Sequence, residues 1–451
     1  MKLTFHGGVG MVTGANYLLE SGDQKILIDC GLFQGNNVFE ELNFKPFPYD
    51  PKEIAAVFIT HSHIDHIGRL PKLYKDGFRG PVFSTAPAKD FAEFLLSDSE
   101  HILQEESESK NLPDIYGKEE INGIMNLWQT VEYRQPFKIG VFEIEYYDAG
   151  HVLGSASVMI SVEGKKIIFS GDLGNVPAPL IKATDYPPVA DYALMETTYG
   201  NRIHEQSAKR KDLLEDLIEE TARNNGVLMI PAFALERTQE LLFELNELIE
   251  NGRVPSMPVF VDSPLAIKLT AVYQKYSGDA KYFNHEAINL VKNGDQIFNF
   301  PGLRMTLTTE QSKEINSAPS PKIVIAGAGM SNGGRILHHE LRYLSDPKSA
   351  ILFIGYQAEG SLGRKILDGA PMVRIMGQEV AVRCKIRVID GYSAHADQPQ
   401  LLKWLETMRF SLRKVFLVQG EKKEINPLQE KIRDELAIET EAPSLGQTVV
   451  I

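Results

Sequence analysis

The first two hundred residues alternate short apolar runs with Gly, Asp and Pro, which is the pattern of a β-rich segment. Several of these runs end in an acidic or hydroxyl side chain. Between them, the helical spacing of apolar residues predicts two helices, at 88–112 and 118–128. The predicted strands read KLTFH, ANYLLES, QKILID, AAVFIT, PVFST, FEIEYYDAG, ASVMISVEG, KKIIFSGD and YALMET.

From about residue 201 the pattern changes to a strand followed by a helix, repeated four times. The four strands read VLMIP, PVFVDS, KIVIAGAGM and ILFIGYQ. This alternation predicts a parallel, Rossmann-like sheet over 201–370, which gives an α/β fold class. The last stretch, 371–451, returns to strand, loop, helix and strand. We expect it to join the first part, so that the middle segment is an insertion.

Length and composition limit the classes of protein that fit this pattern. A chain of 451 residues predicts two or three folding units. Its two cysteines, Cys30 and Cys384, have no C-x-x-C spacing, which argues against a disulfide framework and a cysteine-built zinc site. A net charge of −13 gives no support for binding nucleic acid through bulk charge. No membrane-length apolar run and no secretory signal is visible, so we expect no membrane partner and a cytoplasmic location.

The stretch THSHIDHIG, residues 60–68, follows one of the predicted strands. His61 and His63 are two positions apart, so in an extended chain their rings point to the same side and can hold one cation. Asp65 and His66 fall where the chain turns, which places them better for a neighbouring ion. The pattern H-x-H-x-D-H therefore indicates two metal ions close together. The alternative is a polar loop that is rich in histidine by chance.

Other predicted strands end in metal-binding side chains as well. Taken singly, an Asp before Gly is usually turn chemistry and a lone His is usually structural. Their repetition at strand ends indicates one site, and imidazole and carboxylate are natural ligands for Zn²⁺. The two oxygens of Asp172 could bridge two ions. The side chains in question are Asp29, His151, Asp172, Glu196 and His395.

The order Asp29, HSHIDH, His151 and Asp172 resembles the metallo-β-lactamase superfamily, whose αββα sandwich holds one or two zinc ions at strand ends. The run ETTYGNR, the α/β insert and GYSAHAD resemble its β-CASP branch of RNA- and DNA-processing nucleases. This resemblance implies a metallo-β-lactamase domain at 1–200 and 371–451, with a β-CASP insert at 201–370.

The resemblance also implies roles for individual residues. The first zinc ion would be bound by His61, His63, His151 and Asp172, and the second by Asp65, His66 and Asp172. The catalytic residues would be Asp65, Asp29, Glu196 and His395. Among them, Asp29 would hold a metal ligand or the metal-bound water in place without binding the metal itself. Glu196 would orient His395, which protonates the departing 3′ oxygen.

One position departs from the family pattern. RNA-cleaving members have a histidine that binds the second zinc ion at the end of a late strand, where KVFLVQGE presents Gln419. Branches that act on DNA often have an aliphatic residue at this position. An amide oxygen is a weak, uncharged ligand for zinc, so we expect two zinc ions with a weaker second site. The departure leaves open the choice between RNA and DNA.

Loops of the predicted insert offer contacts for a phosphate backbone. They present backbone N–H groups, hydroxyls and guanidinium groups at helix starts, which suit phosphate oxygens. For the loop GAGMSNGG a tight strand-to-helix turn is an equally good explanation. The residues that we predict to bind substrate are Arg237, Ser263, Ser331 and Arg335.

Together these features predict a zinc-dependent endoribonuclease that acts on single-stranded RNA, with His395 as general acid. Three alternatives stay open: an RNA-binding protein with weakened or no catalysis because of Gln419, a nuclease acting on DNA, and a small-molecule hydrolase on the same scaffold. Self-association into a homo-oligomer also stays open.

Overall fold

The computed structural model describes residues 1–35, 37–204, 209–355 and 357–451, and it divides into two compact units. The first unit contains Met1–Ala178, Lys182–Ile203 and His395–Ile451, and the second contains Pro179–Ile181 and His204–Ala394. The chain leaves the first unit and later returns to it, which confirms the predicted insertion. Position 356, within the predicted strand ILFIGYQ, lies outside the described residues.

Two seven-stranded sheets form the centre of the first unit. Their strand orders are β22-β1-β2-β3-β4-β5-β6 and β21-β20-β11-β10-β9-β8-β7. Alternate apolar side chains of the two sheets meet in one buried core, which includes Phe5, Phe58, Tyr146 and Phe169. The strands are β1 Lys2–Phe5, β2 Tyr17–Ser21, β3 Gln24–Ile28, β4 Ile54–Phe58, β5 Val82–Ser84, β6 Trp128–Thr130, β7 Phe137–Ile139, β8 Phe142–Asp148, β9 Ala156–Val162, β10 Lys165–Phe169, β11 Tyr192–Glu196, β20 Lys414–Val418, β21 Glu439–Glu441 and β22 Thr448–Val450.

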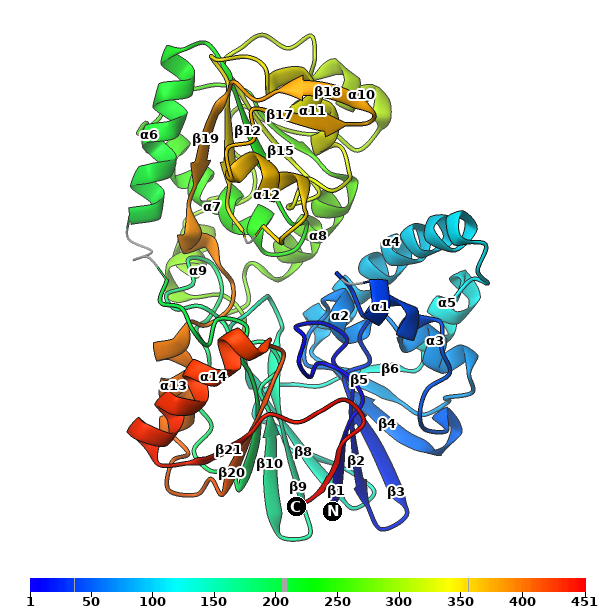
Figure 1. Ribbon diagram of the computed structural model, residues 1–451. Coiled ribbons are helices and arrows are strands. Elements are labelled where there is room, and N and C mark those ends of the chain that lie inside the picture. Colours follow the sequence, from blue (N-terminus) through cyan, green and yellow to red (C-terminus); the bar gives the residue numbers. More distant parts are fainter. Residues whose placement is uncertain (36, 205–208, 356) are drawn as a thin grey trace. The chain divides into compact units, whose positions relative to one another are not determined.

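Helices cover the outer face of each sheet, which completes the predicted αββα sandwich (Figure 1). Leu401, Trp404 and Leu428, from α13 and α14, pack in a second apolar cluster on the outer face of the β10, β11 and β20 sheet. On the other side, α1 to α5 lie against the sheet that contains β1 to β6. The helices are α1 Asn37–Glu40, α2 Ile64–Ile67, α3 Leu70–Lys75, α4 Ala86–Lys110, α5 Lys118–Asn126, α13 Gln398–Glu406 and α14 Lys422–Lys431.

The second unit is built on a six-stranded sheet of order β14-β13-β15-β12-β16-β19, in which every neighbouring pair is parallel. This confirms the Rossmann-like sheet predicted from strand and helix alternation. The strands are β12 Val227–Pro231, β13 Val259–Asp262, β14 Leu303–Met305, β15 Lys322–Ala326, β16 Ala350–Phe353 and β19 Lys385–Val388, and the helices are α6 Arg210–Arg223, α7 Arg237–Glu250, α8 Pro264–Tyr276, α9 His285–Lys292, α10 Thr309–Glu314, α11 Ile336–Tyr343 and α12 Leu362–Leu367.

The second unit extends further along the chain than the predicted insert, 201–370. The hairpin of β17 (Met372–Ile375) and β18 (Gln378–Ala381) belongs to this unit, and β19 pairs with β16 in parallel. The chain therefore completes the parallel sheet before it returns to the first unit at His395.

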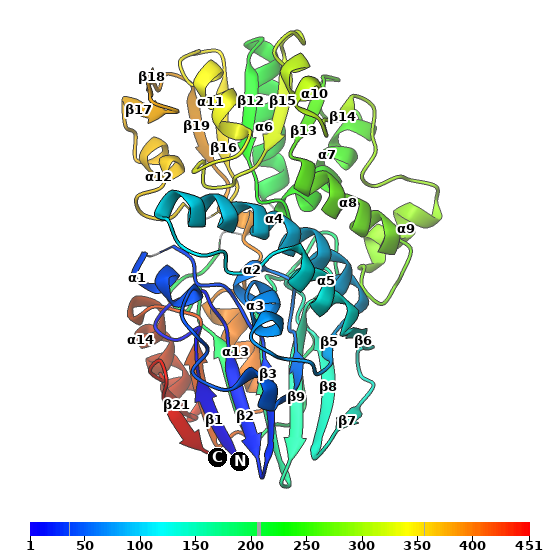
Figure 2. The same cartoon turned by 90° about the vertical axis from the view of Figure 1, so that its right-hand side faces the viewer.

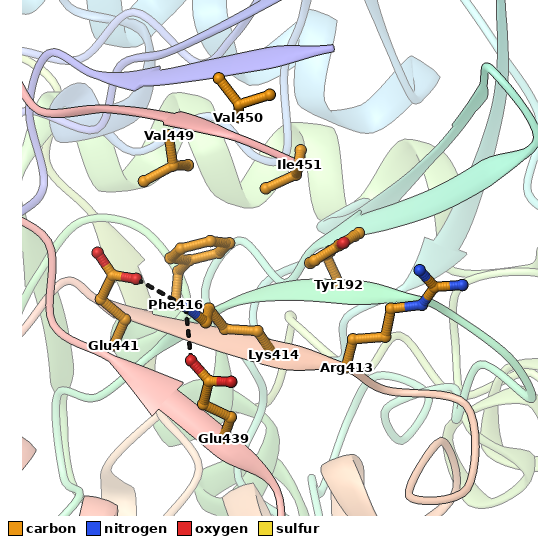
Figure 3. Close-up of a pocket in the computed structure, with 9 residues that line it drawn as sticks. All are labelled: Tyr192, Arg413, Lys414, Phe416, Glu439, Glu441, Val449, Val450 and Ile451. Carbon is orange, nitrogen blue, oxygen red and sulfur yellow. Dashed lines mark hydrogen bonds and ion pairs between the residues drawn. The ribbon is translucent and has the colours of Figure 1, made fainter.

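An open groove of about 400 Å³ lies where β20, β21 and β22 meet in the first unit (Figure 3). Its charged side chains are paired: Lys414 lies 2.6 Å from Glu439 and 3.1 Å from Glu441. No histidine lines this groove. Among the described residues, no helix is both long and apolar enough to cross a membrane.

Candidate metal centre

The ends of six strands in the first unit present the polar side chains predicted from sequence. Asp29 follows β3, His61 follows β4 and His151 follows β8. Asp172, Glu196 and Gln419 stand at the ends of β10, β11 and β20. Because β10, β11 and β20 are parallel neighbours and β3 is parallel to β4, these ends meet at the same edge of each sheet.

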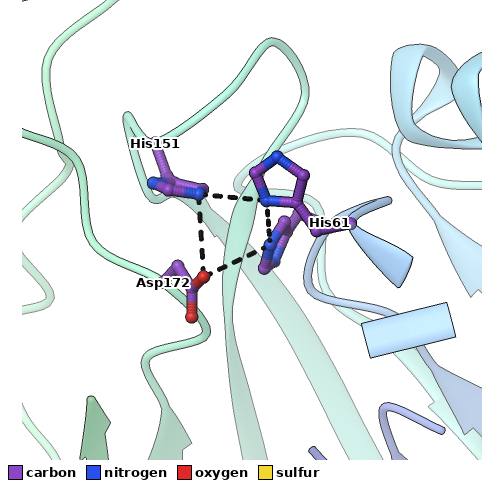
Figure 4. A group of neighbouring side chains, drawn as sticks. His61, His151 and Asp172 are labelled. Carbon is purple, nitrogen blue, oxygen red and sulfur yellow. Dashed lines mark hydrogen bonds and ion pairs between the residues drawn. The ribbon is translucent and has the colours of Figure 1, made fainter. Parts of the chain in front are cut away.

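Four side chains converge on one point at this edge (Figure 4). His63 Nδ1 lies 3.0 Å from His61 Nε2 and 3.2 Å from His151 Nε2. Asp172 Oδ2 lies 3.4 Å from His61 Nε2 and 3.6 Å from His151 Nε2. Three imidazole nitrogens and one carboxylate oxygen therefore face one another, with His61, His151 and Asp172 buried.

This arrangement fits a tetrahedral zinc ion. Four ligand atoms at about 2.0–2.1 Å from zinc lie roughly 3.3–3.4 Å from one another. The four observed separations, from 3.0 to 3.6 Å, bracket that value. A ring nitrogen of a neutral imidazole is either one donor or one acceptor, yet each of the three ring nitrogens lies close to two of the other ligand atoms. The donor set therefore suits a cation better than a hydrogen-bonded cluster.

A second group of ligand-type atoms lies beside the first. His66 Nε2 is 3.3 Å from Asp172 Oδ1 and 3.9 Å from Asp65 Oδ2. The amide nitrogen of Gln419 lies between these atoms, 2.9 Å from His66 Nε2 and 2.6 Å from Asp172 Oδ1. Asp172 thus faces both groups, one oxygen to each. The Gln419 amide therefore bridges His66 and Asp172 within this second group.

Asp29 holds this second group in place. Its Oδ1 accepts a hydrogen bond from the backbone N–H of Thr60 at 2.8 Å, and its Oδ2 accepts one from the Thr60 hydroxyl at 2.8 Å. The same Oδ2 lies 2.7 Å from His66 Nδ1. A carboxylate at Nδ1 favours the tautomer whose proton sits there, which leaves Nε2 free to bind a metal.

Burial and neighbouring charges set the protonation of the cluster. Burial lowers the pKa of His61 well below its usual value, and the nearby ring of His66 adds to this effect, so the His61 imidazole stays neutral. Partial burial raises the pKa of Asp65 to about 6. Burial opposes the charge on His66, but the carboxylates of Asp172, Asp29 and Asp65 prevail and raise its pKa well above the usual value.

Glu196 and His395 form a pair next to the four converging side chains. The Glu196 side chain is fully buried, and its two oxygens lie 3.3 and 3.2 Å from His395 Nδ1. Glu196 Oε1 also accepts the backbone N–H of Leu173 at 2.5 Å. The His395 side chain is 24% exposed, so its ring can meet solvent or substrate. Its Nδ1 lies 3.9 Å from Asp172 Oδ2.

Backbone contacts between loops fix the positions of these groups. Gly174 forms a β-bridge with His395, and a Cβ added at Gly174 would lie 1.8 Å from the carbonyl oxygen of Gly150. Only glycine allows the Asp172 loop to pass this close to the His151 loop. The cluster thus depends on tight loop packing as well as on strand ends.

Two hydroxyl residues near the cluster were not predicted from sequence. Thr60 contacts Asp29, His61 and His66, yet it reads as the last residue of an apolar run. Tyr17, on β2, is buried, and its hydroxyl has no hydrogen-bond partner among the described residues. Burial raises the pKa of Tyr17 well above its usual value, and the charges of Asp29 and Asp172 reinforce the shift.

The four residues predicted to bind substrate lie in the second unit, where most of them have internal partners. Arg335 donates to Asp262 at 2.8 Å and to the carbonyl of Thr306 at 2.9 Å. The buried hydroxyl of Ser331 donates to Glu340 at 2.5 Å. Arg237 lies 3.4 Å from Glu240, and the Ser263 hydroxyl accepts from the first turn of α8. Contact with phosphate stays a prediction for all four.

An αββα sandwich with histidine and aspartate side chains gathered at its strand ends has the architecture of a metal-dependent hydrolase. Comparison with known families agrees with this class. Residues 9–217 match the metallo-beta-lactamase superfamily, residues 238–366 match the Beta-Casp domain, and residues 379–443 match the Zn-dependent metallo-hydrolase RNA specificity domain.

Similar proteins cover almost the whole chain. Ribonuclease TTHA0252 of Thermus thermophilus is 38% identical over 94% of this chain and 94% of its own length. An RNase J-like protein of Methanocaldococcus jannaschii is 31% identical over 100% and 99%. Transcription termination factor FttA of Methanosarcina mazei is 29% identical over 100% of this chain and 71% of its own length. A crystal structure of a protein of unknown function from Enterococcus faecalis shares the fold, with a TM-score of 0.58 at 14% identity over 100% of this chain and 99% of that one.

The chain belongs to the metallo-β-lactamase superfamily, in its β-CASP group, and it is a metal-dependent hydrolase.

Proposed function

We propose that the protein is a zinc-dependent endoribonuclease that hydrolyses phosphodiester bonds in single-stranded RNA. The observation that carries this proposal is the convergence of His61, His63, His151 and Asp172 on one point, with the Glu196–His395 pair beside it. The match to an RNA specificity domain and the names of two relatives as ribonucleases support RNA as the substrate.

We assign the first zinc ion to His61, His63, His151 and Asp172. When bound, zinc supplies a Lewis acid that polarises a phosphoryl oxygen and lowers the pKa of bound water. Glu196 then keeps His395 oriented through Nδ1, so that the other ring nitrogen can give a proton to the departing 3′ oxygen. The products expected from this route are a 5′-phosphate and a 3′-hydroxyl.

We assign a second, weaker zinc position to Asp65, His66 and Asp172. Gln419 supports the weaker affinity, because its neutral amide stands beside His66 and Asp172. Whether the nitrogen or the oxygen of this amide faces a metal, it contributes no negative charge. Asp29 and Thr60 would orient His66 for this position.

Gln419 also favours a second candidate function, an RNA-binding protein with weakened or no catalysis. If the second ion is needed for the reaction, a chain that lacks its histidine ligand would bind RNA and cut it poorly. Activity on DNA, self-association, a cytoplasmic location and phosphate binding by Arg237, Ser263, Ser331 and Arg335 stay predictions.

The test is a cleavage assay with zinc-loaded protein and end-labelled strands of one sequence. Single-stranded RNA, single-stranded DNA and both duplexes are compared, and the product ends are identified. The proposal expects internal cuts in single-stranded RNA that leave 5′-phosphates. Equal cutting of duplex DNA would contradict it, and zinc-loaded protein that binds RNA without cutting it would favour the second candidate.

A further inference from the structure

Phe233 stands at the carboxyl end of β12, in the short loop that leads to α7, and it is 40% exposed. Strand β12 lies between β15 and β16 in the parallel sheet of the second unit (Figure 2). The carboxyl ends of parallel strands are where open α/β sheets bind ligands. An exposed aromatic ring therefore occupies the position of this sheet that is best suited to a ligand.

Glycines of the two neighbouring strands make room for this ring. A Cβ added at Gly329, which follows β15, would lie 2.7 Å from Cδ2 and 2.8 Å from Cε2 of Phe233. A Cβ added at Gly355, which follows β16, would lie 3.4 Å from Cε2. A side chain at Gly329 would thus collide with the ring, whereas one at Gly355 would make an ordinary van der Waals contact with it. One edge of the Phe233 ring, with Cδ2 and Cε2, therefore lies beside these two glycines.

A buried amide links the backbones of Gly329 and Gly355 by hydrogen bonds. Gln357, only 3% exposed, donates from Nε2 to the carbonyl of Gly329 at 2.9 Å and to that of Gly355 at 3.1 Å. The Thr238 hydroxyl donates to the carbonyl of Phe233 at 2.8 Å and fixes the backbone of the loop. The backbone of Phe233 and the two glycines beside its ring are therefore fixed by hydrogen bonds, while 40% of the Phe233 side chain remains exposed.

A single exposed apolar side chain is ordinary on protein surfaces. Phe233 differs because its ring lies beside Gly329 and Gly355 at the ligand-binding edge of the sheet, and Thr238 fixes its backbone. A rigid, exposed aromatic ring gives a flat surface without loss of side-chain freedom on binding. We propose that Phe233 is a stacking platform for one nucleobase of the single-stranded RNA substrate. This inference rests on the proposed function and adds a binding contact in the second unit.

The chemistry of stacking suits this protein. Every nucleobase has a π face, so stacking tolerates any sequence and does not depend on ionic attraction. The chain carries a net charge of −13, so contacts other than bulk charge are needed to hold a polyanion. Loss of one base stack typically weakens binding roughly 5- to 150-fold.

The test compares four substitutions in zinc-loaded full-length protein that carries His395→Ala to slow cleavage during the measurement. Dissociation constants for a fluorescent single-stranded RNA are measured by polarisation. We expect Phe233→Leu and Phe233→Ala to weaken binding roughly 5- to 150-fold and Phe233→Trp to preserve it. The matched control is Phe410→Ala, because Phe410 is 100% exposed and lies in the first unit, between α13 and β20. It should bind as the parent does.

A strand with abasic sites separates stacking from a structural role. On this strand Phe233→Leu should bind as the parent does, because no base remains to stack. The native tryptophans, Trp128 and Trp404, are both buried, so Phe233→Trp adds an exposed fluorophore. Its emission should be quenched by the normal strand and not by the abasic one.

Three results would overturn the inference: equal binding by Phe233→Leu and the parent, equal losses in Phe233→Leu and Phe410→Ala, or a loss that persists on the abasic strand. If wild-type protein cuts single-stranded RNA and any of these results is obtained, Phe233 is not a stacking platform and the proposed function stands. If wild-type protein neither binds nor cuts single strands, the proposed function itself fails.

Discussion

Replacing Asp29 with asparagine tests how the metal centre is held in place. In Asp29→Asn the remaining oxygen can still accept the backbone N–H of Thr60, which lies 2.8 Å from Oδ1 in the native side chain. The new NH₂ group then stands where Oδ2 accepted from the Thr60 hydroxyl at 2.8 Å and faced His66 Nδ1 at 2.7 Å. The new NH₂ group and the N–H at His66 Nδ1 cannot hydrogen-bond to each other, because both are donors. The proton of His66 must therefore move from Nδ1 to Nε2, the nitrogen that faces Asp172.

The size of the effect follows from the lost hydrogen bond. A hydrogen bond to a charged group contributes about 1.5–3 kcal/mol, which corresponds to roughly a 10- to 150-fold change in affinity. Loss of a group that orients a metal-binding histidine typically lowers metal affinity by about 10- to 100-fold, which agrees. We therefore expect the affinity of the second zinc position, which we propose to include His66, to fall by about 10- to 100-fold.

The assay is a zinc titration in competition with a chelator, with the fold checked by circular dichroism. It is run in wild-type protein and in Gln419→His protein, in which the second step should be tighter. The matched control is Asp23→Asn, an exposed aspartate in the turn between β2 and β3. If Asp29→Asn binds both zinc ions as tightly as Asp23→Asn does, Asp29 does not orient His66 for metal.

Three further predictions concern other residues. His395→Ala should keep its zinc while cleavage slows by about 10²- to 10⁴-fold. Metal analysis would report the zinc content and single-turnover assays the cleavage rate. A loss of zinc would mean that His395 is a ligand. Gln419→His should raise the zinc content towards two ions per chain, because imidazole binds zinc better than an amide does. An unchanged zinc content together with an unchanged cleavage rate would contradict the proposal that Gln419 weakens the second zinc position. Burial raises the pKa of Glu340 to about 8, against an unfolded value of 4.5. The stability that its bound proton provides is therefore complete below pH 4.5 and is lost as the pH rises towards 8. Glu340→Gln should flatten the pH dependence of the free energy of unfolding, measured in urea. An unchanged slope would show that Glu340 does not titrate in this range.

The sequence indicated that these side chains would lie together because their residue types have chemical signatures. His61, His63, His151 and Asp172 are residue types that rarely end several apolar runs by chance, and the structure gathers them in one cluster. Thr60 could not be found in this way. A threonine that ends a strand is common, and its bonds to Asp29 and His66 arise only when β3 and β4 pair.

The fold was predictable at the level of local pattern and less so at long range. The helix expected after the strand PVFVDS is observed as α8, because its apolar spacing and its N-terminal Ser-Pro are local signals. The pairing of β19 with β16 joins residues 35 positions apart, such as Ala350 and Lys385, and no local pattern marks it. For this reason residues 371–394 were expected in the first unit and lie in the second.

The internal partners of the predicted phosphate contacts were also beyond the reach of the sequence. Arg335 and Ser331 have the right chemistry for phosphate, but the structure engages them with Asp262 and Glu340. Phe233 follows a predicted parallel strand, which places it at the ligand-binding end of the sheet, but its position beside Gly329 and Gly355 arises only when β12 pairs with β15 and β16.

The most direct measurement is the position of zinc in crystals of the zinc-loaded protein, located by anomalous scattering at the zinc edge. The account predicts a strong peak at about 2.0–2.2 Å from His61 Nε2, His63 Nδ1, His151 Nε2 and Asp172 Oδ2. A peak bound elsewhere, or zinc-saturated crystals with no peak among these four atoms, would contradict it.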